Sequence, residues 1–260
     1  MLTQKPHVLV LSGLDPSGGA GIQADIQAIT ALGCHPLPVL TCLTVQDTNN
    51  VHAAEAVDPE LIHRQLVTLA DDVAIHAVKT GALGGADLIR VLAEFLASRD
   101  SLPYVLDPVI KAAGGGDLAD EQLVSAMLEQ LFPLATVVTP NGPELTQLGD
   151  NTDEDTAARN LLAHGCGSVM ATGGHGKGDQ ITNRLYPLNR PEKSWQIEKL
   201  GGEYHGSGCT LAAGISAGLA RGQTLENAIE TGQAFVSDSI NHALEVGGGY
   251  PVPDRSQNHG

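Results

Sequence analysis

The sequence predicts an α/β fold in which helices cover both faces of a mostly parallel sheet. Short apolar segments alternate with longer amphipathic segments along the 260 residues, the pattern of repeated strand–helix units. Aromatic residues make up only 3% of the chain, so aliphatic side chains must fill the core, as in buried parallel sheets. No linker or internal repeat interrupts the alternation, and residues 1–260 are expected to form a single domain.

The elements follow from the spacing of apolar residues in chain order. Short apolar runs predict strands at 7–11, 39–45, 74–80, 104–109, 135–139 and 169–172, with a hairpin over roughly 179–198. Apolar residues three or four apart predict helices at 22–32, 59–69, 86–97, 120–131, 156–164, 209–220 and 225–244. Asp58 directly precedes the second of these helices and is its expected N-cap.

Charge and composition exclude several classes of function. Thirty acidic residues against 14 Lys and Arg give a formal net charge of −16, which disfavours nucleic acid and anionic lipid as partners. No apolar stretch approaches the ~18 residues of a membrane span, and the N-terminus lacks a signal-peptide core. The four cysteines fit neither a zinc pattern nor a disulfide scaffold. We therefore expect a cytoplasmic protein that binds small molecules.

A first glycine-rich turn, 12–21, joins the first predicted strand to the first helix. It lacks the Gly-Lys-Ser/Thr of a phosphate-binding P-loop and the spacing of a dinucleotide fingerprint. Its glycines would let a flat ligand approach the backbone closely. An ordinary strand-to-helix turn explains the spacing equally well.

A second cluster, Gly206-Ser207-Gly208-Cys209-Thr210, opens an apolar helix. Free amides at such a helix start can bind an anion. A thiol there is expected to have a lowered pKa, because the helix N-terminus favours the thiolate. The alternative is a glycine-rich cap followed by a small buried cysteine.

A third cluster follows the strand predicted at 135–139. Asn141 and Glu144 are three residues apart, and Asp107 follows a neighbouring predicted strand. Ligands in α/β sheets bind at the carboxyl ends of strands, where carboxylates could hold a hydrated Mg²⁺. Asn-Gly-Pro is also a common turn sequence. Lys79 and His205 are lesser candidates, for phosphate and for the wall of the site.

The motifs together resemble those of hydroxymethylpyrimidine/phosphomethylpyrimidine kinases, a family of the ribokinase superfamily. The segment from Gly13 to Asp25, GLDPSGGAGIQAD, is similar to the family's N-terminal signature. The segment from His205 to Leu211, HGSGCTL, resembles its His-Gly-Thr-Gly-Cys-Thr-Leu motif. Asn141-x-x-Glu144 is similar to a motif of the whole superfamily. The resemblance covers roughly residues 7–250.

The resemblance implies a ribokinase-like three-layer sandwich, commonly a homodimer, that binds ATP and a pyrimidine. It implies two successive phosphoryl transfers, which convert a hydroxymethylpyrimidine to its monophosphate and then its diphosphate for thiamine biosynthesis. The pyrimidine pocket would be lined by Gly13, Ala20, Gln46 and Val109. A side-chain amide such as that of Gln46 can pair with a ring nitrogen and an amino group. The role of Asp25 in the signature stays open.

The resemblance also assigns the reacting end of the site. Asp107 and Glu144 would hold Mg²⁺, and Asn141 and Thr172 would contact the nucleotide. Cys209 takes the position of the catalytic Asp of sugar kinases, behind an anion hole formed by Gly206, Ser207 and Gly208. As a thiolate, Cys209 could accept the hydroxyl proton; alternatively, it only shapes the anion hole.

One departure from the family bears on activity. The family usually has Lys where Thr172 stands, so Lys79, Lys111 or Lys177 must replace that cation or catalysis is weakened. Pyridoxine or pyridoxal kinase activity is the second hypothesis, because that activity occurs on the same fold, including enzymes with the Gly-x-Gly-Cys form. A weakly active ligand-binding relative, motivated by the missing Lys, is the third.

Overall fold

Strands and helices alternate along the chain in the computed structural model, which describes residues 4–99, 101–111, 118–173 and 179–256. The strands are β1 His7–Leu14, β2 His35–Gln46, β3 Val51–Ala56, β4 Ala77–Thr80, β5 Tyr104–Leu106, β6 Val137–Val138, β7 Ser168–Ala171, β8 Gln180–Pro187 and β9 Lys193–Glu198. The helices are α1 Gly21–Ala31, α2 Pro59–Asp72, α3 Ala86–Ala97, α4 Glu121–Ala126, α5 Gly142–Leu148, α6 Glu154–Leu162, α7 Ser207–Ala220 and α8 Leu225–Asn241. A π-helical turn, η1 Met127–Leu131, and a 3₁₀ turn, η2 Phe132–Leu134, follow α4.

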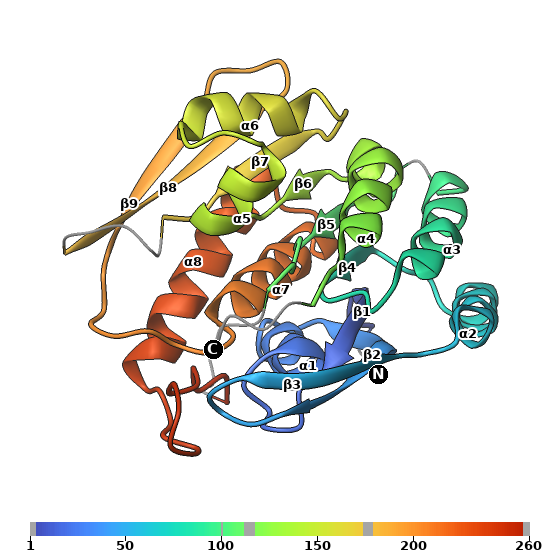
Figure 1. The fold of residues 1–260 in the computed structure, drawn as a ribbon, viewed down its shortest axis with the longest axis horizontal. Helices are drawn as coiled ribbons and strands as arrows, with labels where there is room; N and C mark the ends of the chain where they lie inside the picture. The colour runs from blue at the N-terminus through green and yellow to red at the C-terminus, as the bar shows by residue number, and fades with distance from the viewer. Residues whose placement is uncertain (1–3, 100, 112–117, 174–178, 257–260) are drawn as a thin grey trace.

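All nine strands belong to one sheet, in the order β3-β2-β1-β4-β5-β6-β7-β8-β9 (Figure 1). The six central strands, from β2 to β7, are parallel; at the two edges β3 pairs antiparallel with β2, β8 with β7, and β9 with β8. The chain leaves β1 first toward β2 and later returns to β4 on its other side. Ligands bind at such a reversal of strand order, outside the carboxyl ends of the strands.

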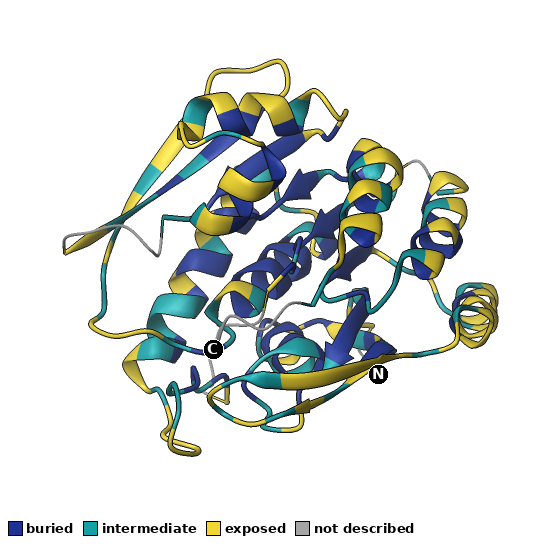
Figure 2. Cartoon of the chain, in the orientation of Figure 1, coloured by how far each residue is buried: buried dark blue, intermediate teal, exposed yellow. Residues whose placement is uncertain are grey.

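The two faces of the sheet are covered by different helices. Leu9 and Leu11 of β1 pack in a core with residues of α2 to α6, whereas Val8 and Val10 pack against α1 and α7. A third cluster joins the other end of the sheet to α7 and α8. Figure 2 shows the sheet and α7 largely buried, with the outer faces of α2, α3 and α6 exposed. The predicted three-layer α/β class is confirmed.

The sequence located most elements but missed two. The edge strand β3 was not predicted, because its sequence, VHAAEA, is mostly exposed and lacks an apolar alternation. Helix α5 was not predicted, because its N-cap and first two residues, Asn141-Gly142-Pro143, are also a common turn sequence. Asp58 accepts a hydrogen bond from the Glu60 amide as the N-cap of α2, as predicted. Among the described helices, none is long and apolar enough to span a membrane.

Helices α7 and α8 approach each other closely through glycine. A Cβ added at Gly214 of α7 would lie 2.8 Å from the Cα of Gly232 in α8. Backbone cannot move aside as a flexible side chain can, so this contact requires a residue without a side chain. The close approach fixes α7, whose first turn faces the cavity described below.

We predict that Gly214→Ala destabilises the protein by about 1–3 kcal/mol, since overpacking forces the two backbones apart. Gly142→Ala, at the start of α5, is the matched control, because nothing lies within 4 Å of its added Cβ. The control is expected to be neutral or slightly stabilising. Urea unfolding of both variants measures the difference, and equal effects would contradict the packing argument.

Candidate active site

A cavity of about 500 Å³ opens at the carboxyl ends of the parallel strands. Residues from the turns after β1, β2, β5, β6 and β7 meet the start of α7 there. The residues that the resemblance assigned to the site all line this cavity: Gly13, Ala20, Gln46, Asp107, Val109, Asn141, Glu144, Thr172, Gly206, Ser207, Gly208 and Cys209. Segments almost 200 residues apart in the chain thus converge on one space.

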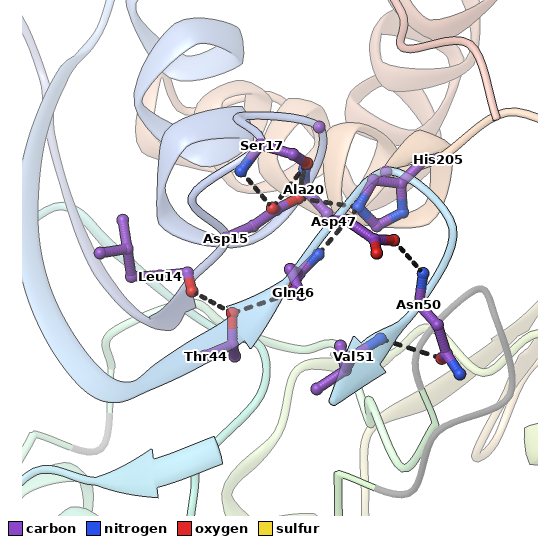
Figure 3. A network of polar contacts seen from close by, with 12 residues as sticks. Leu14, Asp15, Ser17, Ala20, Thr44, Gln46, Asp47, Asn50, Val51 and His205 are labelled. Carbon is purple, nitrogen blue, oxygen red and sulfur yellow. Dashed lines mark hydrogen bonds and ion pairs between the residues drawn. The ribbon is translucent and has the colours of Figure 1, made fainter. Parts of the chain in front are cut away.

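The turn after β1 is organised by the carboxylate of Asp15. Its Oδ1 accepts hydrogen bonds from the amide and hydroxyl of Ser17, and its Oδ2 accepts from the Ala20 amide at 2.8 Å and from His205 Nε2 at 2.7 Å (Figure 3). Burial opposes ionisation of Asp15, but the hydrogen bonds from His205, Ser17 and Ala20 outweigh it and lower its pKa to about 2. Asp15 therefore stays charged and joins the first glycine-rich turn to the residue before the second.

Gln46, at the end of β2, points toward His205 (Figure 3). Its Nε2 lies 3.4 Å from His205 Nε2, and its Oε1 lies 2.9 Å from the Thr44 hydroxyl. Thr44 also donates to the Leu14 carbonyl, which ties β2 to the end of β1. The Gln46 amide is thus held at the cavity wall, as the sequence predicted for a residue that reads a flat heterocycle.

The second glycine-rich cluster forms the first turn of α7. Gly206 has φ +85°, a left-handed conformation that favours glycine, and a Cβ there would collide with the Gly19 carbonyl. The first intrahelical hydrogen bond runs from the Thr210 amide to the Gly206 carbonyl, at 3.0 Å. The amides of Ser207, Gly208 and Cys209 precede that bond, so they can bind an anion at the helix start.

A buried ion cluster lies under this helix start. Lys79 of β4 is 0% exposed, and its Nζ lies 2.9 Å from Asp25 Oδ2 and 3.8 Å from Asp107 Oδ2. Burial alone would lower the pKa of Lys79, but Asp25 and Asp107 raise it above its ordinary value, so the ammonium stays charged. Lys79 does not line the cavity. It is therefore a partnered structural cation, not the replacement for the family's phosphate-binding lysine.

Asp107 and Glu144 form a pair of buried carboxylates beside the cavity. Asp107 Oδ1 accepts a 3.4 Å hydrogen bond from Thr139, whereas its buried Oδ2 has no hydrogen-bond partner. Burial raises the pKa of Asp107. The pKa of Glu144 is raised to about 8, first by its own burial and then by the nearby charge of Asp107. A cation would relieve both effects, so these residues fit Mg²⁺, which binds proteins through one or two carboxylates. The described residues contain no group of three or more acidic, His or Cys metal ligands.

Asn141 and Glu144 also have a local role that the sequence analysis missed. They form a capping box on α5, in which Asn141 Oδ1 accepts from the Glu144 amide and Glu144 Oε2 accepts from the Asn141 amide. The Asn-x-x-Glu spacing is the spacing of this cap. The cap uses one oxygen of Glu144 and holds its carboxyl group near Asp107.

The prediction of a lowered pKa for Cys209 was wrong. Burial raises the pKa of Cys209 to about 12, and the charges of Asp107 and Asp25 add to this, although Lys79 opposes it. The thiol lies close enough to Lys79, Asp107 and Asp25 for their charges to act on its pKa. Burial of the thiol therefore outweighs the partial positive charge of the helix start, which is worth only ~0.5 elementary charge.

The other end of the cavity lies between β8, β9 and α8 and was not predicted. Asn183 Nδ2 donates to Gln233 Oε1 at 2.8 Å, and Asn183 Oδ1 accepts from the Gly173 amide. Apolar residues beside them include Ile181, Ile197, Val236 and Ile240. No motif marks these positions in the sequence. Their placement depends on the β8–β9 hairpin lying against α8.

Thr172 and two lysines also line the cavity. Thr172 lies at the end of β7, and its hydroxyl is 3.5 Å from the Pro140 carbonyl. Lys111, one of the three predicted substitutes, and Lys199 line the cavity. Lys177 lies outside the described residues.

The fold and the cavity define the protein as a small-molecule kinase with a ribokinase-like architecture. The family model described as phosphomethylpyrimidine kinase matches residues 15–253. The hydroxymethylpyrimidine/phosphomethylpyrimidine kinase of Streptomyces coelicolor is 37% identical, over 94% of this chain and 92% of its own. The chain belongs to the phosphomethylpyrimidine kinase family.

Further relatives extend this comparison. The thiamine biosynthesis bifunctional protein ThiED of Geobacter sulfurreducens is 38% identical over 94% of this chain and 51% of its own. An ADP complex of Bacillus subtilis pyridoxal kinase is 31% identical, with a TM-score of 0.87 over 97% and 98% of the two chains. The phosphomethylpyrimidine kinase of Clostridium difficile is 29% identical, with a TM-score of 0.78 over 91% and 100%.

We predict that the Cys209 thiol is protonated at neutral pH. Its alkylation by iodoacetamide should rise steadily up to pH 9 without a plateau, since the thiolate is the nucleophile. Cys209→Ser should keep kcat within about tenfold of wild type, below the roughly 10²–10⁴-fold contribution of a general base. Mass spectrometry of the alkylated peptide and steady-state kinetics test both parts. A titration midpoint between pH 5 and 8 would restore the thiolate hypothesis.

Proposed function

We propose that this protein uses ATP to phosphorylate 4-amino-5-hydroxymethyl-2-methylpyrimidine and then its monophosphate, giving the diphosphate for thiamine biosynthesis. The observation that carries the proposal is the family match over residues 15–253. The cavity supports it, because Gly13, Ala20, Gln46 and Val109 lie at one end of it. These residues offer backbone groups, small or apolar side chains and one side-chain amide, which suits a flat aminopyrimidine.

The pyrimidine would lie between the turn after β1 and the end of β2, with its hydroxymethyl group toward Cys209. ATP would lie along the other end, its base beside Asn183 and Gln233 and its phosphates toward α7. Phosphoryl transfer depends mainly on positioning and charge stabilisation. The amides of Ser207–Cys209 would bind the transferred phosphoryl oxygens as their charge redistributes.

The remaining polar residues would act on charge and orientation. Asp107 and Glu144 would hold Mg²⁺, which neutralises phosphate charge when bound. Lys111 and Thr172 would contact phosphate oxygens in place of the family's lysine. Cys209, as a neutral thiol, would shape the anion hole and orient the attacking hydroxyl. The large rate term in this arrangement is the set of helix amides, not a thiolate base.

A pyridoxal kinase activity is the second candidate. It is favoured by the TM-score of 0.87 to Bacillus subtilis pyridoxal kinase, which exceeds the 0.78 to the Clostridium difficile phosphomethylpyrimidine kinase. Pyridoxal also carries a hydroxymethyl group on a flat nitrogen heterocycle, so the same cavity could hold it.

A homodimer and a cytoplasmic location complete the proposal. The homodimer rests on the family resemblance alone. The four cysteines, Cys34, Cys42, Cys166 and Cys209, are all free thiols, as is usual for proteins of a reducing compartment.

Product analysis with Mg-ATP tests the function directly. We expect hydroxymethylpyrimidine to be converted to the monophosphate and then the diphosphate, with kcat/KM for the pyrimidine above that for pyridoxal. Ion-exchange chromatography of the products separates the two phosphorylation steps. Turnover of pyridoxal with none of the pyrimidine would replace the first candidate by the second.

We predict that Glu144→Gln raises the Mg²⁺ concentration for half-maximal rate by about tenfold or more. The amide keeps an oxygen for the Asn141 N–H, so the α5 cap survives while the charge is lost. Glu129→Gln, an exposed change of the same charge on η1, is the control. KM for the pyrimidine should change little in either variant. A collapse of pyrimidine affinity with unchanged Mg²⁺ dependence would contradict the metal role.

A further inference from the structure

The C-terminal segment, residues 249–255, crosses the molecule beside the active site. Backbone hydrogen bonds tie it in turn to Thr48 in the β2–β3 turn, to His205 before α7, and to Ser239 of α8. The segment ends at Arg255, whose side chain is buried under the two glycine-rich turns. A stretch that the sequence gives no reason to connect with the site therefore contacts three of its walls.

The guanidinium of Arg255 binds both glycine-rich turns at once. Nη2 donates to the Gly19 carbonyl at 2.6 Å and lies 3.5 Å from the Gly206 carbonyl. Nε donates to the Thr210 hydroxyl at 2.7 Å, and Nη1 lies 3.4 Å from Gln27 Oε1. Arg255 is 2% exposed, and such a large side chain is buried with its charge only where it is well hydrogen-bonded.

The two carbonyls belong to the peptide groups that face the site. The Gly206 carbonyl shares its planar peptide with the Ser207 amide, the first of the three amides at the start of α7. The Gly19 carbonyl shares its peptide with the Ala20 amide, which donates to Asp15 at 2.8 Å. A donor on the carbonyl of a peptide fixes its plane and polarises the N–H on the opposite side.

Thr210 strengthens the same arrangement. Its hydroxyl accepts from Arg255 Nε and donates to the Gly206 carbonyl at 2.7 Å. The Gly206 carbonyl thus accepts hydrogen bonds from both the hydroxyl and the amide of Thr210. Arg255 Nη2 lies beside it, at 3.5 Å. A Cβ on Gly206 would meet both the Gly19 carbonyl and Arg255 Nη2. The Gly206 backbone, the Gly19 carbonyl and the Arg255 guanidinium therefore pack directly against one another.

We propose that Arg255 is a positioning residue that sets the direction of the Ser207 and Ala20 amides, and so aligns the anion hole with the bound alcohol. This inference rests on the proposed phosphoryl transfer at the start of α7. Arg255 itself does not line the cavity and acts through the two peptides. Losing the alignment should impair the transition state more than nucleotide binding, because the Asn183 end of the cavity is untouched.

Arg255→Met and Arg255→Lys test the proposal, with Arg221→Met as the matched control. Arg221 caps the other end of α7, and its guanidinium lies 3.4 Å from the Leu32 carbonyl. We expect Arg255→Met to lower kcat by about 10²-fold, as for the loss of one anion-hole donor, while KM for ATP changes less than about threefold. Millimolar guanidinium should restore part of kcat in Arg255→Met. The control should lose stability without losing kcat.

Arg255→Lys keeps the charge but cannot bridge two carbonyls, so it should fold and still lose kcat even where Arg255→Met is unstable. The proposal would be overturned if folded Arg255→Lys had a kcat within threefold of wild type. It would also be overturned if the loss of kcat in all three variants were proportional to their loss of melting temperature. Wild-type turnover of the pyrimidine in the same assay tests the proposed function separately. If pyridoxal proves to be the substrate, the variant-to-wild-type ratio is measured with pyridoxal and tests Arg255 equally well.

Discussion

The ion pair between Lys79 and Asp25 is the constraint on which the rest of the site depends. It joins β4 to α1 at 2.9 Å, fully out of solvent, and brings Lys79 within 3.8 Å of Asp107. A buried charge without a partner would cost several kcal/mol, so each member requires the others in place. The strand end that carries Asp107, the first helix and the start of α7 are thereby fixed relative to one another.

The same cluster sets the chemistry above it. Asp25 is the closer partner of Lys79, at 2.9 Å. Asp107 Oδ2 lies 3.8 Å from Lys79 Nζ and has no hydrogen bond, although it is buried. That oxygen, with Glu144, makes the site suited to a cation. Burial, with the charges of Asp107 and Asp25, also keeps the Cys209 thiol protonated, so the helix start acts through its amides. One buried cluster therefore supports both the proposed metal role and the neutral thiol.

Connections outside the sheet complete the site. Asp15 joins the turn after β1 to His205, and Arg255 joins the same turn to Gly206. Both links hold glycine-rich turns, whose glycines have no side chains of their own to pack. Because glycine leaves the backbone more freedom than any other residue, such turns need contacts from elsewhere to hold one geometry.

The sequence by itself determined the α/β class and nearly all the elements of the central sheet, and its resemblance to a family named many of the residues that line the cavity. The convergence of the glycine-rich and polar clusters could be predicted because parallel strands end at one edge of the sheet. Local patterns misled where one spacing serves two purposes: Asn141 and Glu144 form a helix cap as well as a cavity wall. Only the tertiary structure decided the pKa of Cys209, the internal partner of Lys79, and the contributions of Asn183, Gln233 and Arg255. Each of these depends on charges and contacts between segments far apart in the chain, and no short-range pattern records them.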